Sequence, residues 1–143
     1  QSSTRDAVNT VRRKYTRHPH KYTNIFNEIG DIARDARTYI VQGRPNELPA
    51  LMNSNHKLLQ LLGVSNDRLD HLISAARGAG AMGAKLCGSG LGGNIIALVD
   101  PDTKNQVRNA LLIAGAKRVI LTRVDTKFRK MTEDSPAFSL RSC

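Results

Sequence analysis

Four of the six residues at positions 88–93 are glycine, and this stretch stands between two short apolar runs. The runs cover residues 82–87 and 94–99. A short apolar run bounded by turn residues is typical of a strand. Glycine adopts positive φ at little cost, so a glycine-rich loop can turn tightly and bring backbone N–H groups close to an anion. We therefore expect a strand, a tight loop and a second, buried strand over residues 82–99.

Helical periodicity dominates the chain before this loop. Apolar residues recur in steps of three and four over four stretches, which predict four helices between residues 4 and 80. Pro19, Gly43 and Gly63 separate these helices, since proline and glycine mark helix ends. Ser3 and Ser65 are expected to cap the first and the fourth helix.

After the loop, Asp100 and Pro101 predict the start of a fifth helix, and residues 118–124 predict a last strand. Four helices followed by a strand pair, a helix and a strand indicate an α+β fold. A chain of 143 residues has room for about one domain. We expect this domain over residues 1–124, with the glycine loop and sheet over 82–124, and a basic, disordered tail over residues 125–143.

The loop satisfies the pattern G-x-G-x-x-G at Gly88, Gly90 and Gly93. A dinucleotide-binding loop of this pattern leads into a helix, whereas this one leads into an expected strand. The motifs of the Walker A loop and of protein kinases are absent from the sequence. Two interpretations stay open from spacing alone. The loop either binds an anion or only packs its backbone closely against another element.

Two polar residues on the third predicted helix are further candidates. Asn55 lies on the apolar stripe, where a buried amide must find hydrogen-bond partners or cost about 1–3 kcal/mol. It is either a core residue bonded to nearby backbone or an amide that faces a cleft. His56 lies one step round the helix, and we expect it to be a partly exposed polar residue. No second histidine stands at a spacing that would make a zinc pair with it.

The acidic residues do not form a catalytic pair. Asp31 and Asp35 are four residues apart, but Arg34 and Arg37 surround them, which predicts a solvated helix face with local ion pairs. No combination of serine or cysteine with histidine and aspartate has a spacing specific enough to predict nucleophilic catalysis. The residues therefore indicate an anion-binding loop without a visible general base, and no metal site.

Two stretches resemble the mevalonate kinase family. Residues 51–65 contain Asn-His-x-Leu-Leu followed by Leu-Gly-Val-Ser. Residues 83–98 are similar to the third signature motif of the wider group of galacto-, homoserine, mevalonate and phosphomevalonate kinases. The similarity covers residues 2–124, and the two motifs stand in the right order. It implies the carboxy-terminal domain of such a kinase, with a ferredoxin-like, small antiparallel sheet packed with several helices.

The resemblance also implies an activity. Kinases of this family transfer a phosphoryl group from ATP to a hydroxyl of mevalonate with Mg²⁺, a step of isoprenoid precursor synthesis. A phosphomevalonate kinase, or another small-molecule kinase of the group, is the alternative within it. The ATP-binding loop, the base and the Mg²⁺ ligands of the family belong to an amino-terminal domain, which is the expected partner. We therefore expect no catalytic residue and no metal ligand in this chain, and no turnover by the chain alone.

The resemblance assigns a loop near the substrate and its phosphate to these positions: Lys85, Cys87, Gly88, Ser89, Gly90, Gly92, Gly93 and Asn94. Asn55 is a second, substrate-side candidate. Cys87 stands where the family pattern has threonine, and a thiol is a weaker hydrogen-bond donor than a hydroxyl. Leu91 replaces a glycine, and Asn94 stands where the pattern often has cysteine. The change at Cys87 affects a direct substrate contact rather than the fold, and Asn94 could restore a polar contact nearby.

Two functions of another class compete with this interpretation. The formal net charge of +10 favours a basic module that binds nucleic acid, but aromatic residues make up only 4% and offer few rings on which bases could stack. An interaction domain is the other, since an isolated half would expose apolar surface and could form a homodimer. The two cysteines, Cys87 and Cys143, do not suggest a disulfide framework, so we expect a reducing, cytoplasmic location. No apolar run is long enough to predict a membrane span.

Overall fold

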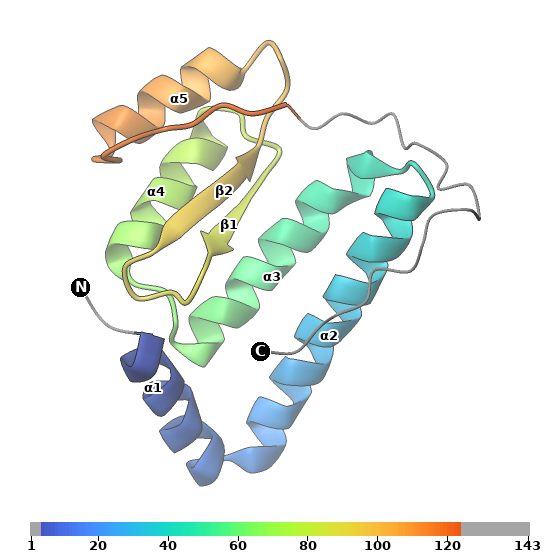
Figure 1. Cartoon of the computed structure of the whole chain (residues 1–143), viewed down its shortest axis with the longest axis vertical. Coiled ribbons are helices and arrows are strands. Elements are labelled where there is room, and N and C mark those ends of the chain that lie inside the picture. The colour runs from blue at the N-terminus through green and yellow to red at the C-terminus, as the bar shows by residue number, and fades with distance from the viewer. Residues whose placement is uncertain (1–3, 124–143) are drawn as a thin grey trace, which may run out of the picture.

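The computed structural model describes residues 4–123, and over this range it contains helices and one two-stranded antiparallel sheet. Figure 1 shows α1 and α2 set apart from the sheet, with α3 between α2 and the sheet. The elements are α1 (Thr4–Arg17), α2 (Pro19–Val41), the short 3-10 helix η1 (Pro45–Glu47), α3 (Leu48–Leu62), α4 (Asp67–Gly78), β1 (Gly83–Cys87), β2 (Asn94–Leu98) and α5 (Lys104–Ile113). The α+β class, the four leading helices and the strand pair are confirmed. The expectation that the second strand is buried is wrong, since the residues of β2 are half-buried or exposed.

The helix ends follow the local chemistry, with one correction. Gly63 ends α3 in the left-handed conformation, with φ of +78°. Asn66, not Ser65, caps α4, because the Asn66 side chain accepts a hydrogen bond of 2.9 Å from the backbone N–H of Leu69. Asn66 is extended and stands three residues before that N–H, which is the geometry of a cap. The predicted cap of α1, Ser3, lies outside the described residues.

The fifth helix begins later than the sequence predicts. Asp100 and Pro101 precede a turn, and α5 starts at Lys104 with Thr103 as its N-cap residue. The Asp100 carbonyl accepts from the backbone N–H groups of both Thr103 and Lys104, at 3.2 and 3.1 Å. These bonds close a turn before the helix, so the first helical residue lies three positions beyond Pro101.

The last predicted strand is wrong over the described residues 118–123, which form neither strand nor helix. The described sheet holds only β1 and β2, paired with each other. An apolar run becomes a strand only where a neighbouring strand satisfies its backbone groups. This segment lacks such a neighbour in the described part of the chain. Residue 124 and the tail over 125–143 lie outside the described residues.

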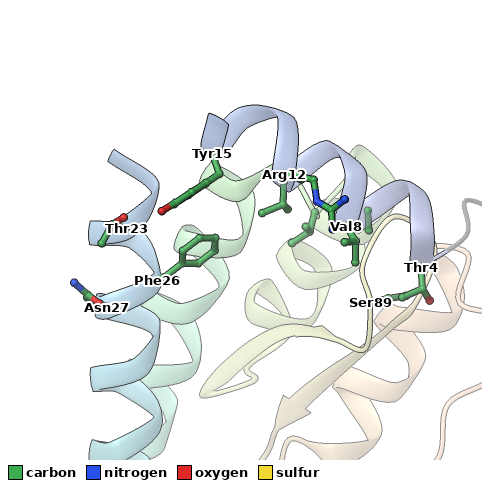
Figure 2. Close-up of a pocket in the computed structure, with 11 residues that line it drawn as sticks. Thr4, Val8, Arg12, Tyr15, Thr23, Phe26, Asn27 and Ser89 are labelled. Atoms are coloured by element: carbon green, nitrogen blue, oxygen red, sulfur yellow. The ribbon is translucent and has the colours of Figure 1, made fainter. Parts of the chain in front are cut away.

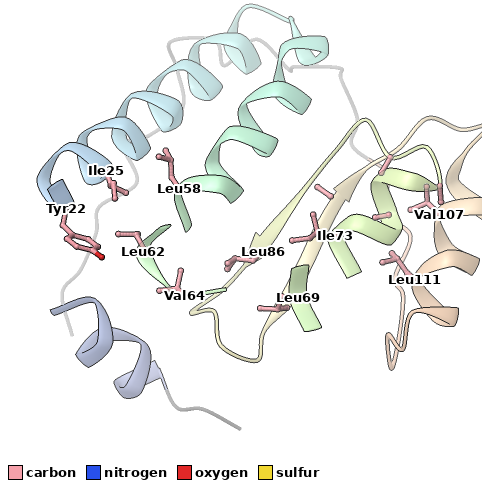
Figure 3. Close-up of a cluster of buried hydrophobic side chains, with 14 residues drawn as sticks. Tyr22, Ile25, Leu58, Leu62, Val64, Leu69, Ile73, Leu86, Val107 and Leu111 are labelled. Carbon is pink, nitrogen blue, oxygen red and sulfur yellow. The ribbon is translucent and has the colours of Figure 1, made fainter. Parts of the chain in front are cut away.

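One apolar cluster joins the hairpin to the helices around it (Figure 3). Antiparallel pairing sets Gly83 opposite Leu98 and Cys87 opposite Asn94. Ala84 and Leu86 are buried, whereas Cys87 is exposed and Lys85 half-buried, so alternate residues of β1 face the core. The buried residues of the cluster come from α2, α3, α4, β1, α5 and the loops between them, and include Tyr22, Ile25, Leu58, Leu62, Leu69, Ile73, Ala76, Ala84, Leu86, Val107 and Leu111.

Candidate functional site

The glycine loop, residues 88–93, connects β1 to β2 in a left-handed backbone. Gly88, Gly90 and Gly92 have φ of +95°, +80° and +151°. Leu91 has φ of +53° and is the residue other than glycine with positive φ among those the structure describes. A β-carbon disfavours this conformation by about 1–2 kcal/mol, so something must hold Leu91 in place.

The turn between α3 and α4 holds the loop. The backbone N–H of Leu91 donates to the carbonyl oxygen of Val64 at 2.8 Å. Gly90 is buried against the same carbonyl, and a β-carbon at Gly90 would lie 2.1 Å from that oxygen. Only glycine fits this contact without displacing the backbone. Gly88, Ser89, Gly92 and Gly93 remain exposed, so the loop has an anchored centre and an exposed rim.

A groove begins at this rim and runs between α1 and α2 (Figure 2). It has a volume of about 710 Å³ and contains Ser89 of the loop and Val64 of the turn. Apolar side chains of α1 and α2, among them Val8 and Phe26, form most of its wall. The remaining residues of the groove are Thr4, Ala7, Val11, Arg12, Tyr15, Thr23 and Asn27. A groove of this size could enclose a small molecule or a segment of another domain.

Side chains of α3 and α4 hold the beginning of β1. The Asn53 side chain accepts from the backbone N–H of Ala84 at 3.1 Å and donates to the Met82 carbonyl at 3.4 Å. Arg77 donates to the Ala84 carbonyl at 2.6 Å. Side chains thus satisfy backbone groups on the edge of β1 that β2 does not cover. Gly83 brings β1 so close to α3 that a β-carbon there would lie 2.7 Å from Cα of Pro49.

Asp70 collects three hydrogen bonds beneath the α3–α4 turn. His56 Nε2 lies 3.1 Å from Asp70 Oδ1, and Ser65 donates its hydroxyl to the same oxygen. Gln60 donates to Asp70 Oδ2 at 2.8 Å. Burial alone would raise the pKa of Asp70, but the hydrogen bonds from Ser65 and Gln60 and the neighbouring His56 together lower it. Asp70 is therefore a carboxylate that accepts hydrogen bonds rather than a candidate general acid.

His56 is the buried histidine of this network. Only 2% of its surface is exposed, so the expectation of a partly exposed residue is wrong. Burial lowers the pKa of His56; Asp70 raises it in part, and Arg77 and Lys85 oppose the protonated form. The neutral ring accordingly donates from Nε2 to Asp70. Its Nδ1 is buried without a hydrogen-bond partner in the described structure.

Comparison with known proteins assigns this chain to a family. The family described as "GHMP kinases C terminal" matches residues 36–117, more than half of the chain. The chain belongs to the GHMP kinase C-terminal family. The match includes η1, α3, α4, the hairpin with its glycine loop, and α5.

Two similar proteins are both named mevalonate kinase. The chain is 38% identical over 139 residues to a protein named mevalonate kinase from Thermococcus onnurineus, which covers 94% of this chain and 41% of that protein. It is 39% identical over 136 residues to the mevalonate kinase of Pyrococcus abyssi, covering 92% of this chain and 40% of that protein. The chain thus spans about two fifths of the length of these relatives.

A solved structure agrees with the sequence comparison. A crystal structure of L. major mevalonate kinase in complex with R-mevalonate superposes with a TM-score of 0.74 at 29% identity. The superposition covers 79% of this chain and 35% of that chain. The GHMP kinase C-terminal fold therefore extends over most of the described residues.

The structure separates the predicted site residues into two groups. Lys85, Cys87 and Asn94 lie with the loop, since Cys87 and Asn94 are paired at the point where the strands end. Asn55 lies apart from the groove on α3, with only 7% of its surface exposed. Its Oδ1 has no hydrogen-bond partner in the described structure, so neither of the two interpretations of this amide is decided.

Sequence reasoning missed the residues that support the loop. Asn53, which holds β1, belongs to the same motif as Asn55 but has no periodicity that would single it out. Sequence patterns did not indicate the groove residues Thr4 and Arg12 either, because the groove brings them together with Ser89, about eighty positions away. A proline-bounded amphipathic helix predicts an apolar face but not what lies opposite it.

The described residues 4–123 hold no group of three or more His, Cys, Asp or Glu side chains that could bind a metal ion. Over the same range, no helix is both long and apolar enough to cross a membrane.

The ion pair between Arg34 and Asp31 confirms the predicted solvated face of α2, since both side chains are exposed.

Proposed function

We propose that residues 1–124 form the carboxy-terminal, substrate-side domain of an ATP-dependent mevalonate kinase. The relatives named mevalonate kinase align with more than nine tenths of the chain, and the structural neighbour was solved with R-mevalonate. The observation that carries the proposal is the exposed rim of the glycine loop at the end of a groove. Such a rim can receive a small anionic substrate and the phosphoryl group moved to it.

The loop fits an anion through its backbone. No backbone carbonyl of residues 4–123 accepts from the N–H groups of Ser89, Gly92 or Gly93. These groups can therefore donate to a carboxylate or phosphate oxygen. Lys85, which is half-buried on β1, adds positive charge near the loop. The thiol of Cys87 is a weak donor, so we assign the direct contacts to backbone N–H groups, the Ser89 hydroxyl and the Asn94 amide.

ATP supplies the transferred phosphoryl group, and Mg²⁺ neutralises charge on its phosphates. The described residues offer no acidic cluster for Mg²⁺, so we place its ligands and the general base on the amino-terminal part of the longer protein. This chain then positions the substrate, while that part activates its hydroxyl. We therefore expect the 143-residue chain alone not to turn over.

A phosphotransfer assay tests the proposal. ADP release is measured with Mg-ATP and mevalonate for the 143-residue chain and for the longer protein that contains it. We expect release from the longer protein only. Release with phosphomevalonate, but not with mevalonate, would move the substrate to the phosphorylated relative. No release with either substrate would contradict the kinase assignment, and release by the 143-residue chain alone would contradict the placement of the base.

A loop variant adds specificity to the assay. In the longer protein, Ser89→Ala is expected to raise KM for mevalonate, since the Ser89 side chain lines the groove. The matched control is Ser74→Ala, at an exposed position of α4 outside the groove. The control should leave KM unchanged. An equal change in KM for both variants would contradict a contact between Ser89 and the substrate.

A further inference from the structure

The glycine loop rests on a turn that is also hydrogen-bonded to Asp70. Leu91 and Gly90 contact the carbonyl of Val64. Val64 precedes Ser65, whose hydroxyl donates to Asp70. The turn over residues 63–66 therefore contacts both the loop and the Asp70 carboxylate, and a displacement of Ser65 would also displace the carbonyl that holds the loop.

Several interactions fix the position of the Asp70 carboxylate. It lies in the first turn of α4, where the positive end of the helix dipole favours a negative charge. His56 and Gln60, both on α3, donate to its two oxygens at 3.1 and 2.8 Å. His56 is itself buried. Three donors from two elements thus fix the carboxylate, and hydrogen bonds to a charged group are among the stronger ones.

We propose that Asp70 is a positioning residue for the glycine loop, acting through Ser65 and the carbonyl of Val64. It does not line the groove and is therefore not a catalytic residue. The bond from Ser65 carries the effect, because Ser65 is the donor that belongs to the turn. The bond from Gln60 comes from α3 and should be dispensable for the loop. This inference extends the proposed function but does not need kinase activity for its test.

Amide hydrogen exchange in the 143-residue chain measures the loop directly. The reporter is the backbone N–H of Leu91, which donates to Val64. The reference is the N–H of Met82, which donates to the Leu98 carbonyl at 2.9 Å at the other end of the hairpin. The ratio of the two exchange rates separates local opening of the loop from unfolding of the whole domain.

We expect Ser65→Ala to raise this ratio by at least about tenfold, because loss of a hydrogen bond to a charged group frees the turn. Asp70→Asn should act in the same direction. Gln60→Ala is the matched control, since it removes a side-chain hydrogen bond from the same carboxylate and keeps the backbone bond from Gly63 to the Gln60 carbonyl. It should change the ratio by less than about twofold. If Asp70→Asn does not fold, Ser65→Ala against Gln60→Ala still decides.

An unchanged ratio in Ser65→Ala would overturn the inference, and so would an equal rise in Gln60→Ala. Either result would leave the kinase proposal intact. Conversely, a longer protein without kinase activity would leave the exchange result, and the positioning role of Asp70, unaffected.

Discussion

Two helices of the described chain, α1 and α4, use their apolar residues differently. In α4, twelve residues long, Leu69, Ile73 and Ala76 are all buried. In α1, fourteen residues long, only Ala7 is buried. The arm formed by α1 and α2 leaves Val8, Tyr15 and Phe26 exposed by 40% or more, and Figure 1 shows it beside the rest of the molecule rather than within it.

The difference between α1 and α4 shows that a sequence can form an amphipathic helix without the apolar face of that helix being buried. Both regions have the periodicity that makes amphipathic helices, so both are helical. Burial needs a second surface, and the hairpin provides one for α3 and α4 but not for the groove side of α1 and α2. The groove therefore marks apolar surface that the described residues leave uncovered, which fits a chain that spans two fifths of its relatives.

The largest expected effect tests this contrast directly. Ile73→Ala removes a side chain with 1% exposure from the core and should lower the free energy of unfolding by about 4 kcal/mol. Phe26→Ala, in the groove, removes a larger side chain but should cost only about 1 kcal/mol, because 40% of the residue is already exposed. Urea unfolding measures both values. Equal losses would mean that the arm is packed as tightly as the core.

The next effect concerns the anchored and exposed parts of the loop. Gly90→Ala should lower the free energy of unfolding by about 3 kcal/mol, since it adds a clash with the Val64 carbonyl to the cost of positive φ. Gly88→Ala has the same kind of backbone conformation but no atom within 4 Å of the new methyl group. It should cost about 1 kcal/mol. A loop that is not docked on the turn would show similar losses for both variants in urea unfolding.

A smaller effect appears when the pH is lowered. The pKa of buried His56 lies below its usual value of 6.5, so the unfolded chain takes up a proton before the folded chain does. Stability from this group is fully present above about pH 6.5. It should fall as the pH drops through this range towards the lowered pKa. Asp70, whose pKa also lies below its usual value, loses its contribution only under more acidic conditions.

Urea unfolding at pH 7.5 and 5.5 measures this decline. His56→Gln should flatten it, because the variant removes the titrating ring. The matched control is His71→Gln, at an exposed position of α4, which should retain the decline. A similar decline in the wild-type chain and in His56→Gln would assign the pH dependence to another group.

The smallest expected effect lies on the exposed face of α2. Asp31→Asn breaks the ion pair with Arg34, in which both side chains are well exposed. Exposed pairs of this kind contribute about 0–0.5 kcal/mol, so the thermal unfolding midpoint should hardly change. A midpoint shift as large as the one measured for Gly88→Ala in the same thermal experiment would show that α2 depends on its surface charges more than on packing.

The sequence alone determined the elements whose signals are local. Glycines and two short apolar runs predicted the hairpin at residues 82–99, and steps of three and four predicted the helices before it. These patterns depend on neighbours within one or two turns, where backbone preference and side-chain period decide the conformation. The family motifs of residues 51–65 and 83–98 likewise pointed to the kinase family before any contact between them was known.

Only the tertiary structure decided how these pieces act on one another. Gly88 and Gly90 look alike in the sequence, but only Gly90 lies against Val64. His56 is buried because Asp70, fourteen residues away, accepts its hydrogen bond. The run at residues 118–123 forms no strand, since the described sheet offers it no partner. In each case the outcome depends on a residue distant in the sequence. Local periodicity does not predict which distant residue will lie opposite a given side chain.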